Sequence, residues 1–362
     1  MIRWTILPVT EFAGHAAQWQ ALNDQGARSP LLSLDFVEPL LSEFLVGGEK
    51  LAIGSDEGVV VAMAVMTPTR AGAWETFQPS QAPLGMWVNR AGVAIDAALD
   101  SLVRALPGFP LMVGITQADP WLAPRPAHSS TLATIDYIET ARIRLDGSFD
   151  AFWAARGKNL RANLKKMRPR MLKEGITARL ETLRQPQQMT EALATYGRLE
   201  SAGWKASGGT AIAADNAQGR FYAAMLERFC RRDAACVQRY WFNDQVVAVD
   251  LCIEGENCVI ILKTTYDETV PGYFSPTFLM REETVKQLFD EQRFSTLEFY
   301  GKAMEWHRKW SNDIRTMYHI NNYRWPVLHK LHAVVQQRAA RQHQQRHPVP
   351  ATAPAPAPLT PE

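Results

Sequence analysis

The stretch from residue 236 to residue 310 decides the fold of this chain, because strand, loop and helix signals follow one another in it without a gap. It begins with the apolar runs CVQRYWF (236–242), QVVAVDLCI (245–253) and NCVIILKTTYD (257–267). Turn sequences at Asn243-Asp244 and Glu254-Gly255-Glu256 separate these runs, a pattern typical of an antiparallel meander. The sequence therefore predicts three consecutive antiparallel strands.

The third predicted strand runs into a loop, 268–274, and then into a helix. Ser275 offers an N-cap hydroxyl, and Pro276 stands at the first helical position before an apolar stripe with helical spacing. A helix start of this kind presents unpaired N–H groups and the positive end of the helix dipole, which suits a pyrophosphate. Many helices start with Ser-Pro and bind nothing, so the loop alone leaves both interpretations open.

The composition is that of a globular protein long enough for two domains. The chain has 362 residues, of which 46% are hydrophobic and 21% charged. A net charge of +2 argues against nucleic acid as the main partner. The four cysteines form no CxxC pair, so we expect neither a zinc site nor a disulfide framework.

No secretory or membrane-spanning segment stands out in the sequence. The N-terminus lacks a basic head followed by an apolar run, and the longest apolar stretch, 59–66, has the length of a strand. We therefore expect a soluble cytoplasmic protein without a membrane span.

Strand and helix signals alternate in both halves of the chain, which predicts a duplicated α/β (α+β) fold with mixed, mostly antiparallel sheets. We place the first domain at 1–145 and the second at 146–335. The segment 341–362 is rich in proline and alanine, cannot build a core and is expected to be disordered.

The second half opens with a strongly basic helix. Eight Lys or Arg residues and no acid lie between 156 and 173. An apolar stripe and a basic face share this helix, and Pro169 is expected to kink it. The stripe consists of Leu160, Leu164, Met167 and Met171, and the face of Lys158, Arg161, Lys165 and Arg168. Three uses stay open: a solvated face, a surface for a phosphorylated or acidic partner, or an RNA contact.

Three titratable residues in the deciding stretch are candidates for acid–base chemistry. With a tight turn at 254–256, Asp250 lies opposite Ile261 and diagonal to Lys263 on one sheet face, either as an ion pair or as a base with a raised pKa. Glu298 is either a base or a solvated edge residue. His307 could accept a proton near neutral pH, although lone histidines are usually not catalytic.

A separate cluster of candidate residues, Glu200-Ser-Ala-Gly-Trp-Lys205, stands at the end of a predicted helix, before the loop Ser207-Gly-Gly-Thr210. Glu200, Trp204 and Lys205 could hold a substrate there. The alternative is a C-cap at Gly203, with Trp204 packed into the core.

Together these features resemble the GNAT-superfamily acyltransferases of the CelD type, which are associated with cellulose and other exopolysaccharide biosynthesis and are distant relatives of the Fem transferases. The resemblance covers roughly 146–325. It rests on the basic helix with Arg161 and Arg168, the Glu200–Lys205 cluster, the strand end Lys263–Glu268, the Ser275-Pro276 helix start, and Glu298-Phe299 with Trp310 downstream. Two positions depart from the family pattern: Thr277 replaces a glycine, and Trp306-His307 replaces Tyr-Lys.

The resemblance implies tandem GNAT-like domains, of which the second binds acyl-CoA and the first is a degenerate copy that shapes an acceptor cleft. It implies no metal. Its implied cofactor-binding residues are Lys263, Thr264, Thr265, Tyr273, Phe274, Ser275 and Thr277, and Glu200, Trp204, Lys205 and Arg161 are expected to bind substrate.

The implied reaction is direct transfer of an acyl group, in the first instance acetyl, to an amine or hydroxyl of a small molecule or saccharide. The base is expected among Glu298, His307 and Asp250, and Tyr266 is expected to protonate the leaving thiolate. Two alternatives remain: a Fem-like transferase that takes its aminoacyl group from tRNA, and a non-catalytic partner in a polysaccharide-synthesis complex.

Overall fold

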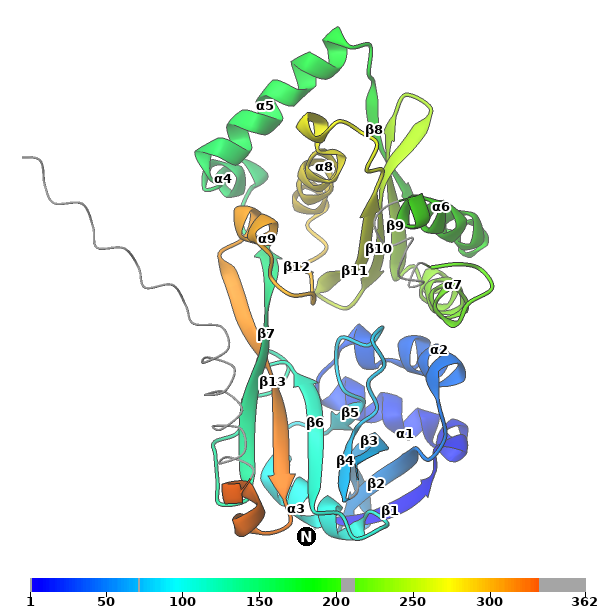
Figure 1. The fold of residues 1–362 in the computed structure, drawn as a ribbon, viewed down its shortest axis with the longest axis vertical. Helices are drawn as coiled ribbons and strands as arrows, with labels where there is room; N and C mark the ends of the chain where they lie inside the picture. Colours follow the sequence, from blue (N-terminus) through cyan, green and yellow to red (C-terminus); the bar gives the residue numbers. More distant parts are fainter. Residues whose placement is uncertain (1, 71, 203–211, 332–362) are drawn as a thin grey trace, which may run out of the picture.

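The computed structural model describes residues 2–70, 72–202 and 212–331. Within them one mixed sheet runs through the whole molecule in the order β1-β2-β3-β4-β6-β13-β7-β12-β11-β10-β9-β8, with β5 paired to β3. Helices cover the sheet in two lobes (Figure 1).

The N-terminal lobe holds the first six strands and three helices. Its strands are β1 Arg3–Pro8, β2 Lys50–Asp56, β3 Val59–Arg70, β4 Ala73–Thr76, β5 Trp87–Asn89 and β6 Met112–Ala118. Its helices are α1 Phe12–Gln25, α2 Leu34–Phe44 and α3 Ile95–Ala105.

The C-terminal lobe holds the predicted meander and six helices. Its strands are β8 Ala178–Leu183, β9 Ala235–Phe242, β10 Gln245–Glu254, β11 Cys258–Tyr266 and β12 Thr296–Glu298. Its helices are α4 Phe149–Ala154, α5 Lys158–Lys173, α6 Met189–Ala202, α7 Ala217–Cys230, α8 Pro276–Glu291 and α9 Glu305–Trp310.

Two long antiparallel strands, β7 (Leu132–Arg144) and β13 (Asp313–Tyr323), join the lobes. Near its C-terminal end β7 pairs with β12 of the C-terminal lobe, and β13 pairs with β6 of the N-terminal lobe. Figure 1 shows both strands passing from one lobe to the other. Neither the length of β7 nor the strand β13 was predicted from the sequence.

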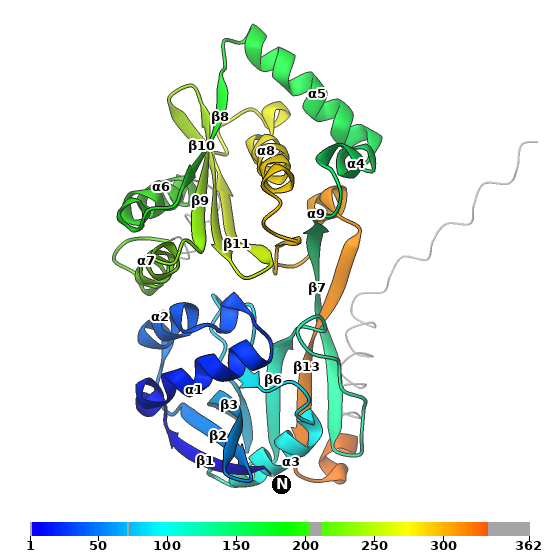
Figure 2. The same ribbon diagram turned by 180° about the vertical axis from the view of Figure 1, so that it is seen from behind.

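Helices cover both faces of the meander in the C-terminal lobe. Figure 2 shows α6 and α7 on the face opposite α8. As a result nearly all of β10 is buried, which explains why its sequence is a continuous apolar run instead of an alternating one. The four residues of the apolar stripe of α5 are all buried, as predicted.

The lobes also pack directly against each other through α2 and α7. The ring of Phe221 on α7 lies edge-on to Phe36 and Phe44 of α2, with centroids 5.4 and 5.6 Å away. Ion pairs border this contact, among them Arg220 with Glu43 at 2.8 Å. A single buried apolar cluster therefore includes residues of both lobes.

Candidate active site in a splay between two strands

Strands β11 and β12 are paired over a short distance only and then separate. Their parallel pairing joins Cys258 to Thr296 and ends where Ile260 meets Glu298. Strand β11 continues to Tyr266 beside β10, whereas β12 ends at Glu298 and the chain turns at Tyr300, whose φ is 45°. We call the wedge between residues 261–266 and 299–300 the splay.

A β-bulge at Leu262 in β11 changes which side chains meet across the meander. Leu251 pairs with Lys263 but Cys252 pairs with Ile261, which leaves Leu262 as an extra residue. The predicted pairing of Asp250 with Ile261 is wrong, because Asp250 lies opposite Thr264. The turn forms one residue later than predicted, which moves each partner by two positions, and the bulge adds a third. One added residue exchanges the two faces of a strand. Lys263 thus leaves the face of Asp250 and lies 5.9 Å from the ring centre of Tyr222.

The partner of Asp250 is Arg281 of α8 instead of the expected Lys263. The two side chains are fully buried and form an ion pair at 2.8 Å. The Thr264 hydroxyl donates a hydrogen bond of 2.6 Å to the second carboxylate oxygen. This environment is that of a structural counter-ion, because both oxygens of Asp250 face protein groups.

The loop before α8 forms a short 3-10 turn, Gly272–Phe274, and then a left-handed residue, Ser275, with φ 32°. Pro276 takes the first helical position, as predicted. The predicted N-cap bond of the Ser275 hydroxyl is wrong, because this hydroxyl donates to the Gly272 carbonyl at 3.0 Å. The next amides, at Phe278 and Leu279, bond to the Ser275 carbonyl.

Several groups at this loop suit a phosphate. The Thr277 amide has no acceptor among the described residues, and a Cβ built on Gly272 would meet nothing within 4 Å. The guanidinium of Arg170, on α5, lies 3.5 Å above the ring of the exposed Tyr273. Phe274, by contrast, is buried in the core beside Phe242. The loop therefore offers backbone donors and a nearby cation, as an anion site needs.

His307 lies on α9 at the far side of the splay, against the rings of Phe299 and Trp306. Burial and the positive charge of Arg281 lower the pKa of His307 to about 4. The Met304 amide donates to its Nδ1 at 2.9 Å. The neutral ring must then carry its proton on Nε2. His307 is therefore placed as a hydrogen-bond donor, with no free lone pair for the predicted role of base.

The lowered pKa of His307 makes the stability of the fold sensitive to acid. Its stabilising contribution is complete above pH 6.5, the ordinary pKa, and is lost as the pH falls toward 4. Between pH 7 and pH 4.5 we expect the free energy of unfolding of the wild type to fall by about 2–3 kcal/mol more than that of a His307→Asn variant. The asparagine oxygen can still accept from the Met304 amide but does not titrate. Urea unfolding at both pH values measures this, and an equal loss in both proteins would contradict it.

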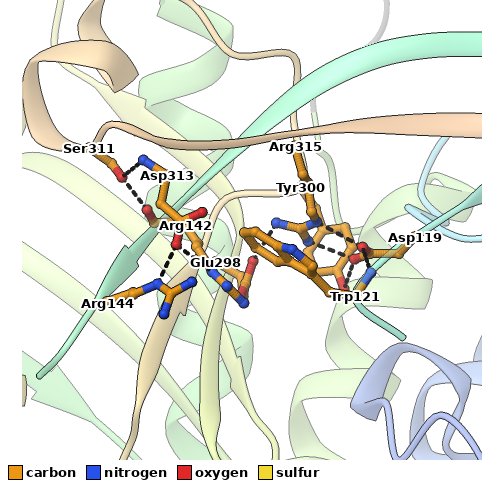
Figure 3. Close-up of polar contacts among 9 residues, drawn as sticks. All are labelled: Asp119, Trp121, Arg142, Arg144, Glu298, Tyr300, Ser311, Asp313 and Arg315. Atoms are coloured by element: carbon orange, nitrogen blue, oxygen red, sulfur yellow. Dashed lines mark hydrogen bonds and ion pairs between the residues drawn. The ribbon is translucent and has the colours of Figure 1, made fainter. Parts of the chain in front are cut away.

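Glu298, at the end of β12, lies in a buried ion network (Figure 3). Arg315 of β13 donates from Nη1 to one Glu298 oxygen at 2.9 Å. It also forms a two-bond contact with Asp119, at 2.8 and 2.7 Å. The Tyr300 hydroxyl donates to Asp119 at 2.9 Å. The network therefore ties together β6, β12 and β13.

Burial raises the pKa of Glu298, although the charge of Arg315 opposes this change. The other carboxylate oxygen of Glu298, Oε1, accepts no hydrogen bond from the described residues. Glu298 is thus neither the solvated edge residue nor a fully satisfied ion-pair partner. A buried carboxylate with a raised pKa and a free oxygen fits a general base.

The network continues toward the surface on β7 and β13. The Trp121 ring lies between the guanidinium groups of Arg142 and Arg315, with the latter 4.0 Å from its centre. Asp313 accepts bonds from Arg142 at 3.0 Å and Arg144 at 2.6 Å. Partial burial acts to raise the pKa of Asp313, but these hydrogen bonds lower it overall. Figure 3 shows the Trp121 ring beside Arg142 and Arg315.

The remaining predicted residues are spread around this centre. Glu200 is buried and accepts a hydrogen bond from the Ile212 amide at 2.9 Å, so its carboxylate has a structural contact in the described chain. Trp204 and Lys205 lie outside the described residues. Arg161 donates to the Arg156 carbonyl at 3.1 Å, and Tyr266 is 45% exposed at the end of β11. Thr265 is buried next to it.

Three central residues were not found from the sequence: Asp119, Arg281 and Arg315. Asp119 lies 196 positions from Arg315, so no local pattern relates the two. Arg281 carried a weak signal, because at helical spacing it lies on the same face of α8 as Phe278 and Val285, where another apolar residue is expected.

The splay and the helix start beside it define a protein with a GNAT-type acyltransferase fold. Residues 158–308 match the family model of the acetyltransferase (GNAT) domain. The chain therefore contains a GNAT-fold, acetyltransferase-like domain, and the predicted fold class is confirmed. A search of the curated proteins found no match.

Solved structures with the same fold cover nearly the whole chain. FemX is 11% identical with a TM-score of 0.56, over 90% of this chain and 99% of that one. The L-PGS structure from Bacillus licheniformis is 14% identical with a TM-score of 0.52, over 85% and 91%. The C-terminal domain of a candidate lysylphosphatidylglycerol synthetase from Agrobacterium fabrum is 12% identical with a TM-score of 0.53, over 91% and 97%. At these identities the likeness shows the fold.

Helices long and apolar enough to cross a membrane are missing from residues 2–70, 72–202 and 212–331. In the same ranges, no group of three or more His, Cys, Asp or Glu side chains is arranged to hold a metal ion.

Proposed function

We propose that this protein is an acyltransferase that moves an acyl group from acyl-CoA to an amine or hydroxyl acceptor. The observation that carries the proposal is the splay, which opens directly beside the N-terminus of α8. Such a wedge leaves backbone groups of β11 without strand partners, and these suit the amides of a pantetheine arm. The Thr277 amide and Arg170 would hold the pyrophosphate.

Glu298 is the residue we propose as general base. Of the three predicted candidates, Asp250 is enclosed by Arg281 and Thr264, and His307 has its Nδ1 occupied. The acceptor nitrogen or oxygen would attack the thioester carbonyl while its proton passes to Oε1 of Glu298. The C–S bond then breaks, and Tyr266 at the exposed end of β11 would protonate the departing sulfur.

The acceptor in this proposal is a small molecule or saccharide, as the CelD-type resemblance suggests, in polysaccharide or cell-envelope biosynthesis. The N-terminal lobe, 1–145, would form one wall of the acceptor site. Glu298 supports this, because its carboxylate is bonded to Arg315 of β13, which also binds Asp119 just after β6 of the N-terminal lobe.

Aminoacyl transfer from tRNA is the second candidate, and one observation favours it. Four lysines of α5 are exposed and have no carboxylate partner among the described residues: Lys158, Lys165, Lys166 and Lys173. Arg168, in contrast, pairs with Glu282 and Glu283 of α8 at 2.6 and 3.1 Å. The remaining lysines form a surface that could contact phosphates.

Calorimetric titration with acetyl-CoA tests the proposal. We expect binding in the wild type and binding at least tenfold weaker in a Gly272→Asp variant, because a carboxylate beside the Thr277 amide repels the pyrophosphate. Gly157→Asp, at the start of α5 where a Cβ also meets nothing, is the matched control. Binding of tRNA that weakens steeply with salt, without binding of acetyl-CoA, would contradict the proposal and support aminoacyl transfer.

A further inference from the structure

Arg281 is a buried cation with more hydrogen-bond donors than partners. Its side chain is 2% exposed, and its ion pair runs from Nη2 to Asp250. Its Nε and Nη1 are buried and have no hydrogen-bond partner among the described residues. Leaving a buried donor unpaired costs about 1–3 kcal/mol, and more for a charged group. Such unpaired groups are rare in native proteins, where a bound water, an ion, local strain or a functional role accounts for them.

The guanidinium of Arg281 lies across the splay. On one side it pairs with Asp250 of β10, and on the other its Cζ is 5.4 Å from the ring centre of Phe299, just after β12. Strand β11 lies between β10 and β12 in the sheet, so the side chain passes over the opening. The two unpaired donors therefore belong to a side chain that spans β11, from Asp250 to the ring of Phe299.

A third buried donor without a partner lies close by. Nε1 of Trp310 has none among the described residues, and its ring is 6.1 Å from that of Phe278, one turn before Arg281 on α8. The rings of Phe278 and Phe299 lie beside Trp310 and Arg281, so the three buried N–H groups have partly apolar surroundings, as polar groups in small-molecule sites do.

The charge of the Arg281–Asp250 pair indicates which acceptors its unpaired donors suit. Arg281 and Asp250 together carry no net charge, so their remaining N–H groups suit neutral carbonyl oxygens better than phosphates. Arg281 comes five residues after Pro276, which places it about 7.5 Å along the helix from the proposed pyrophosphate site at 1.5 Å per residue. The first amide of a pantetheine arm lies at a comparable distance from the pyrophosphate.

We propose that Arg281 positions the thioester arm of acyl-CoA by donating from Nε and Nη1 to its carbonyl oxygens. This inference rests on the proposed function. It adds a residue that binds the thioester arm of acyl-CoA and does not contact the nucleotide. The N-terminus of α8 holds the phosphates, and one turn and a half later the same helix holds the arm.

The test compares ligands with and without the arm by calorimetry on the Arg281→Lys variant. Lysine keeps a cation beside Asp250 but cannot supply both donors. We expect CoA and acetyl-CoA to bind about tenfold to a hundredfold more weakly, since hydrogen bonds from charged groups are lost. The affinity for 3′-phospho-ADP, which has no arm, should change less than about twofold. Arg293→Lys, 44% exposed after the end of α8, is the matched control.

The outcomes separate this inference from the proposed function. A wild type that binds neither acetyl-CoA nor 3′-phospho-ADP would show that the proposed function is wrong. If the wild type binds acetyl-CoA but Arg281→Lys weakens all three ligands equally, or none of them, the inference alone is overturned. Should Arg281→Lys fail to fold, the double variant Asp250→Asn, Arg281→Met removes the buried charges together, and the same comparison is made.

Discussion

Replacing Arg315 with methionine is expected to lower the free energy of unfolding by about 3–5 kcal/mol, because it leaves two buried carboxylates without their partner. Asp119 loses both of its bonds from the guanidinium, and Glu298 loses its bond at 2.9 Å. Both carboxylates are nearly inaccessible to water. Since the network joins β6, β12 and β13, the loss should affect the contact between the lobes.

Chemical denaturation measures this change, and Arg144→Met is the matched control. Arg144 also forms an ion pair, with Asp313, but its side chain is 60% exposed. Exposed pairs contribute about 0.2–1 kcal/mol. Similar losses in the two variants would show that the Arg315 network is no more important than a surface pair. Adding Asp119→Asn and Glu298→Gln to Arg315→Met should recover part of the stability, because the uncompensated charges are then removed.

Replacing Glu298 with glutamine is expected to lower kcat about 10²–10⁴-fold with little change in the KM for acetyl-CoA, because the amide cannot accept the acceptor's proton. Glutamine keeps an oxygen for Arg315, so the fold should be retained. The measurement is release of free CoA thiol from acetyl-CoA in the presence of amine and sugar acceptors. Since burial raises the pKa of Glu298, wild-type kcat should fall with acid at a pH above 4.5.

Glu305→Gln is the control for this prediction, since Glu305 lies seven residues further on and its side chain is 91% exposed. It should leave kcat unchanged. If thermal unfolding shows that Glu298→Gln and Glu305→Gln are both folded, an equal kcat in the wild type and Glu298→Gln would rule out Glu298 as the base. In that case the non-catalytic alternative, a GNAT-fold partner of other enzymes, would gain weight.

The meander, the helix start and the basic helix were predictable because each depends on residues close together in the chain. Turn residues at Asn243 and Gly255 set the strand ends, and Pro276 marks the beginning of α8. Leu160, Leu164 and Met167 recur every three to four residues, a spacing that places them on one face of a helix. Local periodicity and turn chemistry therefore carried these predictions.

The chemistry inside the splay depends on contacts that no local pattern contains. Because Leu262 is an unpaired residue, Lys263 lies on the other face of the strand from Asp250. The cation that pairs with Asp250 is Arg281, on the separate helix α8. A bulge arises from how two strands fit against the layers around them, and that fit is not written in either strand alone.

The sequence by itself determined the type and order of the elements around the deciding stretch and the presence of an acyltransferase-like helix start. Only the tertiary structure decided which of Asp250, Glu298 and His307 keeps a free proton acceptor. The physical reason is that the pKa and the free lone pairs of a buried group depend on neighbours such as Arg281 and Arg315. Those neighbours arrive from distant parts of the chain through packing.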